Sequence, residues 1–263
     1  GATIADEIAV IKEAQEHLKI VNLGATAIGT TVTAHPEYPA LAVKHLAEIT
    51  GIDFKNSDDL IAATSDCGAY VALSSAVKSL AVKLTKVCND LRLLASGPRT
   101  GLSELILPQL QPGSSIMPGK VNPVIPEVTN QACFLAIGLD TTVMLAASAG
   151  QLELNVMEPV ITFALYMQMK VLTNACNHLR EKCIDGIVVN AEHCKDLVMG
   201  SLGIVTLLKP HFGYKPCANI AREGFLTGKS LHQLVVEEKG MLTQEQWDHT
   251  FTYENLINPK FEK

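Results

Sequence analysis

The fold is decided by residues 66–94, DCGAYVALSSAVKSLAVKLTKVCNDLRLL. Apolar side chains recur in this stretch at steps of three and four, which places them on one stripe of a helix. A stripe of this length is typical of a bundle of long helices with small crossing angles. We therefore expect one long helix that begins at Ser65 or Asp66 and ends before Gly97. The stripe consists of Tyr70, Leu73, Val77, Leu80, Leu84, Val87, Leu91 and Leu94.

Two further segments downstream have the length and composition of bundle helices. One opens at Pro126, a residue suited to a first helical turn, with Glu127 near the positive end of the helix dipole. The other covers residues 155–184 and carries no charge from Val160 to Met169. A helix that is apolar on every side must be buried on every side. We therefore expect the bundle to pack against further copies of itself.

The segments upstream of residue 66 are shorter. Residues 4–23 have helical spacing, and Pro39 suits the first turn of a helix that ends at Gly51. Residues 24–39 form a threonine-rich loop, which is as typical of a small-anion site as of a connection packed at the end of a bundle. Residues 57–59, Ser-Asp-Asp, can cap a short helix.

The pattern changes after Gly186, where proline and glycine separate shorter helical segments. We expect these segments at residues 193–208, 215–227, 230–239 and 243–250, with the only tryptophan, Trp247, in their core. The predicted fold class is all-α. A long-helix bundle covers residues 1–190, with its start missing, and a small helical C-terminal domain covers residues 191–263.

Composition excludes several classes of protein. Hydrophobic residues make up 48% of the chain and charged residues 18%, so the chain is not disordered. The net charge of -6 and the absence of a basic patch interleaved with aromatics give no reason to expect nucleic acid. No run of about 18 residues is apolar throughout, so we expect no membrane span.

The seven cysteines include no CxxC pair, and most lie in apolar helical stretches. Reduced, buried thiols of this kind are typical of the cytoplasm, and residues 1–7 do not resemble a secretory signal. The eight histidines lack metal-ligand spacing, and Thr227-Gly228-Lys229-Ser230 lacks the leading glycine of a phosphate loop. We predict no metal site and no organic cofactor; activation by a divalent metal stays open.

Residues 99–125 form a long loop between two predicted helices. Three prolines and two glycines between residues 112 and 123 forbid a regular helix or central strand there. Long loops in compact folds are usually functional. This loop carries Ser114, Ser115, Lys120 and Asn122, a set that can bind a carboxylate and supply an oxygen base. Taken singly, each of these residues is more typical of a turn or a solvated surface position than of an active site.

The loop sequence GSSIMPGKVNP, residues 113–123, resembles the signature loop of the aspartase/fumarase superfamily. Three other segments are similar to ammonia-lyase members of that superfamily: NLGATAIGT at residues 22–30, ATSDCGAY at 63–70 and LNVMEP at 154–159. A fumarase would be expected to carry a basic residue where Glu158 stands. The resemblance runs from about residue 15 to near the C-terminus.

The resemblance implies a fold, a reaction and an assembly. It implies reversible elimination of ammonia from L-aspartate to give fumarate, without an organic cofactor. Ser114 would be the base, and Ser115, Lys120 and Asn122 would bind the dicarboxylate. Members of the superfamily are homotetramers that build each site from three sequence regions on three different subunits.

The sequence also departs from the superfamily. Two of its three signature regions lie upstream of the shared loop and are absent here, so we expect this chain to lack an N-terminal portion and to be inactive by itself. Two alternatives stay open: a fumarate hydratase of the same superfamily, or a helical oligomerisation module without activity. Asp66 is interpreted as a helix cap, Cys67 as a buried thiol and Glu158 as a structural residue at a helix start.

Overall fold

The computed structural model describes residues 1–258, and the chain divides into two units. Unit 1 is Gly1–Val188 and unit 2 is Val189–Lys263, so the division lies two residues before the predicted boundary. The described residues are mainly helical, which confirms the predicted all-α class.

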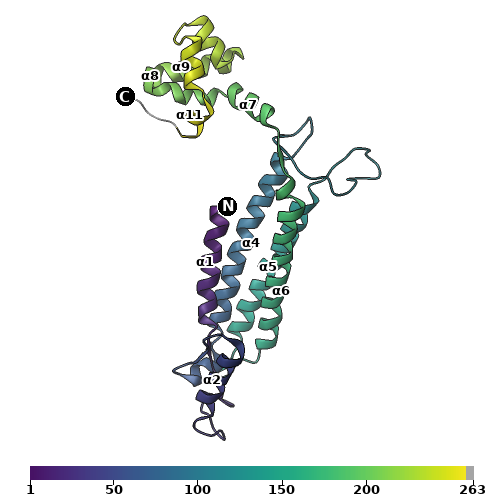
Figure 1. Ribbon diagram of the computed structural model, residues 1–263, viewed down its shortest axis with the longest axis vertical. Coiled ribbons are helices and arrows are strands. Elements are labelled where there is room, and N and C mark those ends of the chain that lie inside the picture. Colours follow the sequence, from purple (N-terminus) through teal and green to yellow (C-terminus); the bar gives the residue numbers. More distant parts are fainter. Residues whose placement is uncertain (259–263) are drawn as a thin grey trace. The chain divides into compact units, whose positions relative to one another are not determined.

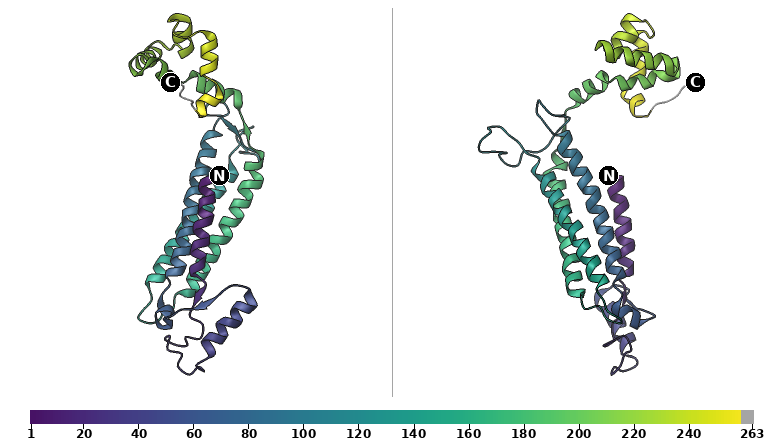
Figure 2. Two further views of the ribbon diagram at one scale, coloured as in Figure 1. Left: turned by 60° about the vertical axis from the view of Figure 1, so that its left-hand side comes forward. Right: turned by 180° about the vertical axis from the view of Figure 1, so that it is seen from behind.

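Unit 1 is built on four long helices that lie side by side (Figures 1 and 2). They are α1 (Ala2–His17), α4 (Gly68–Leu94), α5 (Val124–Ser148) and α6 (Glu158–Lys182). Helix α5 packs extensively against both α4 and α6, and α4 also packs against α1. Consecutive helices run in opposite directions, so the α4–α5 connection lies at one end of the bundle and the α5–α6 connection at the other (Figure 2).

The predicted stripe on α4 faces the core. Leu73, Val77, Leu84 and Leu91 are buried, and the other members of the stripe are partly buried. The facing positions of α5 and α6 include small residues that allow close helix packing. These are Cys133, Ala136, Ala146, Ala164 and Ala175. The amphipathic spacing therefore predicted both the helix and its buried face.

The first predicted helix is too long by six residues. Helix α1 ends at His17, and the next residues form strand β1 (Ile20–Val21). Strand β1 pairs in parallel with β2 (Lys55–Asn56), in the register Ile20 with Lys55 and Val21 with Asn56. Pairing with a segment distant in sequence overrides the local helical spacing.

Two other helix starts also differ from the prediction. Helix α6 begins at Glu158 rather than at residue 155, because the Asn155 amide holds a turn. Its Nδ2 donates to Ala146 O and to Ala147 O, both at 3.1 Å, and its Oδ1 accepts the Met157 N–H at 2.8 Å. Helix α5 begins at Val124, so Pro126 lies inside its first turn.

The connection between α1 and α4 contains two shorter helices that follow the prediction. Helix α2 (Tyr38–Thr50) ends at Gly51, which adopts φ 70°. Helix α3 (Leu60–Ser65) is capped by Asp59, which accepts the N–H groups of Ile61 and Ala62. Helix α4 begins at Gly68, later than the predicted Ser65 or Asp66, and its N-cap position is Cys67 rather than Asp66. Asp66 instead accepts the Gly68 N–H at 2.9 Å in the turn that precedes the helix.

Short elements complete unit 1 and lead out of it. Strand β3 (Leu105–Ile106) lies in the loop between α4 and α5. A 3-10 turn, η1 (Ile184–Gly186), follows α6 and precedes strand β4 (Val188–Val189). The second two-stranded sheet has the order β3-β4.

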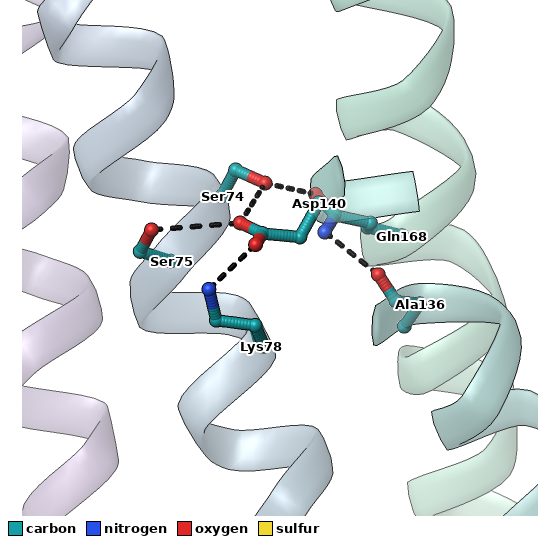
Figure 3. Close-up of polar contacts among 6 residues, drawn as sticks. All are labelled: Ser74, Ser75, Lys78, Ala136, Asp140 and Gln168. Atoms are coloured by element: carbon teal, nitrogen blue, oxygen red, sulfur yellow. Dashed lines mark hydrogen bonds and ion pairs between the residues drawn. The ribbon is translucent and has the colours of Figure 1, made fainter. Parts of the chain in front are cut away.

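A buried polar layer joins α4, α5 and α6 (Figure 3). Asp140 of α5 is 7% exposed, and its Oδ2 lies 2.5 Å from Lys78 Nζ of α4. Ser74 Oγ lies 2.8 Å from Asp140 Oδ1 and 3.2 Å from Gln168 Oε1 of α6. Gln168 Nε2 in turn donates to Ala136 O at 2.9 Å. These contacts fit only one axial register of the three helices.

Among the described residues, α5 is the helix whose length and hydropathy meet the criteria for a membrane span. The sequence of α5 is not an uninterrupted apolar run, because it contains the buried Asp140. That carboxylate is paired with Lys78 inside the bundle, and α5 packs on two neighbouring helices. Part of the apolar surface of α5 therefore serves helix packing within the bundle, and 28% of its most apolar stretch is buried there.

Unit 2 is a set of short helices around its own core. The core includes Leu208, Ile220, Leu234 and Trp247, which confirms the predicted place of the tryptophan. The predicted segment 193–208 is divided at Ser201, whose side chain accepts the Gly203 N–H. The elements are α7 (Ala191–Gly200), η2 (Leu202–Leu208), α8 (Lys209–Phe212), α9 (Tyr214–Thr227), the π-helix η3 (Gln233–Glu238), α10 (Gln244–Thr250) and α11 (Tyr253–Ile257).

Removing the cation of the polar layer will destabilise unit 1. Lys78→Met leaves Asp140 buried without its partner, and we expect the free energy of unfolding to fall by about 2 kcal/mol, since Lys78 is partly exposed. Urea unfolding followed by circular dichroism measures the change. Lys86→Met is the control, because it breaks an exposed pair with Asp90 on the same helix. An equal cost for the two variants contradicts this account.

A second buried carboxylate will make the bundle sensitive to acid. Glu7 of α1 is 4% exposed, and its hydrogen bond with Lys83 of α4 holds the pKa of the carboxyl below its usual range, although burial opposes this. The native state therefore holds fewer protons on Glu7 than the unfolded state does. The stabilisation is present at neutral pH and is lost as the pH falls through the lowered pKa.

Glu7→Gln should flatten that pH dependence. Urea unfolding at about pH 7 and about pH 3 compares the variant with the parent chain. Glu13→Gln, at an exposed position of the same helix, is the control and should leave the pH dependence unchanged. If the free energy of unfolding of Glu7→Gln falls with acid as much as that of the parent chain, Glu7 is not the source of the acid sensitivity.

Candidate active site on the loop between α4 and α5

The loop that carries the predicted site residues starts at the end of α4 and returns at the start of α5 (Figure 1). Its first part is fixed to α4 by backbone hydrogen bonds. The Ser103 N–H donates to Ser96 O at 2.7 Å, and the Glu104 N–H donates to Leu94 O at 2.9 Å. A stable bundle end therefore holds a loop that is itself irregular, which is a common setting for functional groups.

The distal part of the loop closes on itself. The Gly113 N–H donates to Lys120 O at 2.8 Å, and the Asn122 Nδ2 donates to Gly113 O at 3.0 Å. Glycine is required at position 113, because a Cβ there would lie 2.4 Å from Lys120 O. This closure gathers the four predicted residues, 114, 115, 120 and 122, into one short ring.

Within the ring, Ser114 sits as an acceptor. Its Oγ accepts the backbone N–H of Ile116 at 3.0 Å and that of Met117 at 3.3 Å. Two N–H donors on one oxygen favour the anionic form of that oxygen over the neutral hydroxyl. The loop thereby supplies what a serine would need to act as a base. Its catalytic role stays a prediction.

The other three predicted residues differ in which polar groups remain available to bind a ligand. Lys120 and Ser115 are exposed, and the Lys120 ammonium makes no ion pair with residues 1–258. Asn122 is half-buried and commits one amide hydrogen to Gly113. Its second amide hydrogen remains for a ligand. The loop thus offers a cation, a hydroxyl and one amide donor around the Ser114 oxygen.

The ring is open to solvent in this single chain. Ile116 is 90% exposed and Met117 is 59% exposed. A cavity of about 520 Å³ lies at the opposite end of the bundle, lined by Tyr70 in the first turn of α4 and by Glu158, the first residue of α6. None of the four predicted site residues lines that cavity. A substrate enclosed at the ring would need walls from outside this chain.

Five of the seven cysteines are buried thiols. Cys67 is 3% exposed, and burial raises its pKa, with further contributions from the charges of Glu158 and Asp66. Burial raises the pKa of Cys88 to about 12. Neutral, buried thiols are poor nucleophiles. Within residues 1–258, no group of three or more His, Cys, Asp or Glu side chains is arranged to hold a metal ion.

Sequence reasoning missed two features that support the loop. The close approach at Gly113 is visible only once the ring is folded. Asn130 of α5 is 3% exposed and joins Asn89 of α4. A signal for Asn130 was present, because it lies on the stripe of α5 that also contains Pro126 and Cys133.

Family comparisons cover most of the chain. The model of the family described as "Lyase" matches residues 2–138, and that described as "Fumarase C C-terminus" matches residues 204–258. The chain is 54% identical to the aspartate ammonia-lyase of Escherichia coli strain K12 over 258 residues, which are 98% of this chain and 54% of the relative. It is 51% identical to the aspartate ammonia-lyase of Helicobacter pylori over 253 residues, with 96% and 54% covered. The chain spans about half the length of these relatives.

Solved structures agree in fold. A fumarate lyase:delta crystallin from Brucella melitensis, bound to cobalt, superposes with a TM-score of 0.90 at 42% identity, over 95% of this chain and 54% of that one. A class II fumarase from Schistosoma mansoni superposes with a TM-score of 0.89 at 30% identity, over 98% and 57%.

Closure of the ring predicts a local sensitivity at Gly113. Gly113→Ala forces a Cβ against the Lys120 carbonyl, so the ring should open and trypsin should cleave after Lys120 faster than in the parent chain. Limited proteolysis followed by mass spectrometry measures the rate. Gly138→Ala is the control, because a Cβ there meets open space on α5 and should leave the cleavage unchanged. Equal cleavage in all three chains would refute the ring.

Proposed function

The chain belongs to the aspartase/fumarase superfamily of lyases, and we propose that it forms the C-terminal part of an aspartate ammonia-lyase. The proposed reaction is the reversible elimination of ammonia from L-aspartate to give fumarate. One observation carries the proposal: the Ser114 oxygen, on the loop that resembles the superfamily signature, accepts two backbone N–H groups. The relatives at 54% and 51% identity are ammonia-lyases, which favours ammonia over water as the leaving group.

The chemistry demands a base and strong anion stabilisation. The C–H group at Cβ of aspartate is a very weak acid. Removal of its proton places a second negative charge on the adjacent carboxylate. Ser114, as the alkoxide, takes that proton. The electron pair of the broken C–H bond then forms the carbon–carbon double bond as the Cα–N bond breaks. Fumarate and ammonia are the products.

The ring supplies the groups that such a step requires. The Lys120 ammonium is a compact charge suited to the carboxylate that gains charge. Ser115 and the free amide hydrogen of Asn122 add neutral donors. The N–H groups of Ile116 and Met117 stabilise the Ser114 alkoxide before it accepts the proton. In this proposal the substrate is a small dicarboxylate and no organic cofactor takes part.

We further propose that copies of the chain complete the site as a homotetramer. Only 28% of the most apolar 18-residue stretch of α5 is buried within one chain. On α6, Phe163 is 59% exposed and Tyr166 is 54% exposed; on α5, Phe134 is 57% exposed and Leu145 is 60% exposed. Large exposed apolar faces mark protein interfaces. The seven free cysteines suit the reducing cytoplasm, where we place the protein.

Removal of the base tests the function directly. In the full-length protein, Ser114→Ala should lower kcat for fumarate formation from L-aspartate by at least 100-fold, because general base catalysis contributes about 10²–10⁴-fold. Ultraviolet absorbance of fumarate measures the rate. Ser148→Ala, at an exposed serine near the end of α5, should keep full activity. Size-exclusion chromatography checks that both variants keep the parent assembly.

Two results would contradict the proposal. Full activity in Ser114→Ala removes Ser114 as the base. Formation of malate from fumarate and water, with no aspartate formed when ammonia is added, assigns the chain to a fumarate hydratase instead. Residues 1–263, assayed alongside, should form no fumarate by themselves.

A further inference from the structure

One side-chain hydrogen bond joins α4 to α5 close to the loop. Asn130 Nδ2 of α5 donates to Asn89 Oδ1 of α4 at 2.8 Å. Asn89 lies five residues before Leu94, the end of α4, and Asn130 lies six residues after Val124, the start of α5. The bond therefore links the two helices beside the points where the loop departs and returns.

Stability alone does not explain an amide at position 130. The side chain is 3% exposed, and its Oδ1 is buried without a hydrogen-bond partner among the described residues. A buried acceptor without a donor destabilises the folded state. An apolar residue of similar size would avoid that cost on the buried stripe of α5. What the amide adds is the bond to Asn89.

The ring is connected directly to the first turn of α5. The Asn122 side chain donates a hydrogen bond to Gly113 O, and the Gly113 N–H donates to Lys120 O. These two bonds close the segment 113–122 into one unit. Pro123, the residue that precedes α5, follows this unit directly. Any axial slip of α5 along α4 would therefore carry the Ser114 oxygen with it.

Two polar contacts oppose such a slip. The Asp140 layer acts ten residues further along α5 than Asn130, about 15 Å away. That distance makes the Asp140 layer a less direct constraint on the end of α5 that bears the loop. The Asn89–Asn130 bond fixes the end that bears the loop.

We propose that Asn89 and Asn130 are positioning residues for Ser114, acting through the register of α4 against α5. This inference rests on the proposed function and deepens it. Neither side chain touches the ring, and neither is a catalytic residue. A misplacement of about 1 Å at a reacting group can cost about 100-fold in rate. Loss of the bond should therefore lower the rate of elimination while the helices stay folded.

Asn89 offers a clean variant because it is exposed. In the full-length protein, Asn89→Ala removes the acceptor of the Asn130 N–H without creating a cavity. We expect kcat for fumarate formation to fall about 10- to 100-fold. Asn89→Asp keeps an oxygen that accepts the same N–H, so its kcat should stay within about twofold of the parent value. Asn177→Ala, at an exposed asparagine of α6, is the matched control and should keep full activity.

The melting temperature and the size in solution are measured for each variant, and kcat is measured well below every melting temperature. A purely structural role predicts a lower melting temperature in Asn89→Ala with kcat unchanged, and that result overturns the inference. An equal loss of kcat in Asn89→Asp and Asn89→Ala also overturns it. If Ser114→Ala is inactive while Asn89→Ala is fully active, this inference fails and the proposed function stands. If Ser114→Ala is fully active, Ser114 is not the base and this inference fails with that assignment; if the full-length parent forms no fumarate from L-aspartate, the proposed function fails.

Discussion

The packing of α5 between α4 and α6 is the constraint on which the rest of the structure depends. Small residues bring the three helices close together, and a buried carboxylate at Asp140 fixes their register because its partners stand on the neighbouring helix. A buried charge is tolerated only with a partner and hydrogen bonds in place. The packed helices in turn hold the two ends, Leu94 of α4 and Val124 of α5, between which the connecting loop lies.

The loop between α4 and α5 holds the candidate catalytic groups in a defined arrangement. An irregular segment would ordinarily sample many conformations, but the bonds from Gly113 to Lys120 and from Asn122 to Gly113 close it into a ring. Inside the ring, backbone donors are aimed at the Ser114 oxygen, while the Lys120 ammonium stays exposed. Two N–H donors on this oxygen favour its anionic form, which is the form that can accept a proton.

The sequence predicted those parts of the fold that local chemistry determines. The apolar stripe of α4, the cap at Asp59 and the helix end at Gly51 all follow from side-chain spacing or backbone preference, and the structure confirms them. The helix prediction for residues 18–23 is wrong. Ile20 and Val21 pair with β2, which lies more than thirty residues away in sequence, so local spacing does not reveal the strand. The resemblance identified Ser114, but no local pattern reveals which amides face its oxygen. The Asn89–Asn130 contact likewise depends on two helices meeting in one register.

The central claim is that the Ser114 oxygen, held by the amides of Ile116 and Met117, removes the proton from Cβ of the substrate. A crystal structure of the full-length protein with an unreactive dicarboxylate analogue tests it most directly. The account predicts Ser114 Oγ within about 3 Å of the carbon that corresponds to Cβ, with both N–H bonds to the oxygen retained. A structure in which another side chain occupies that place, with Ser114 remote from the closed site, would contradict it.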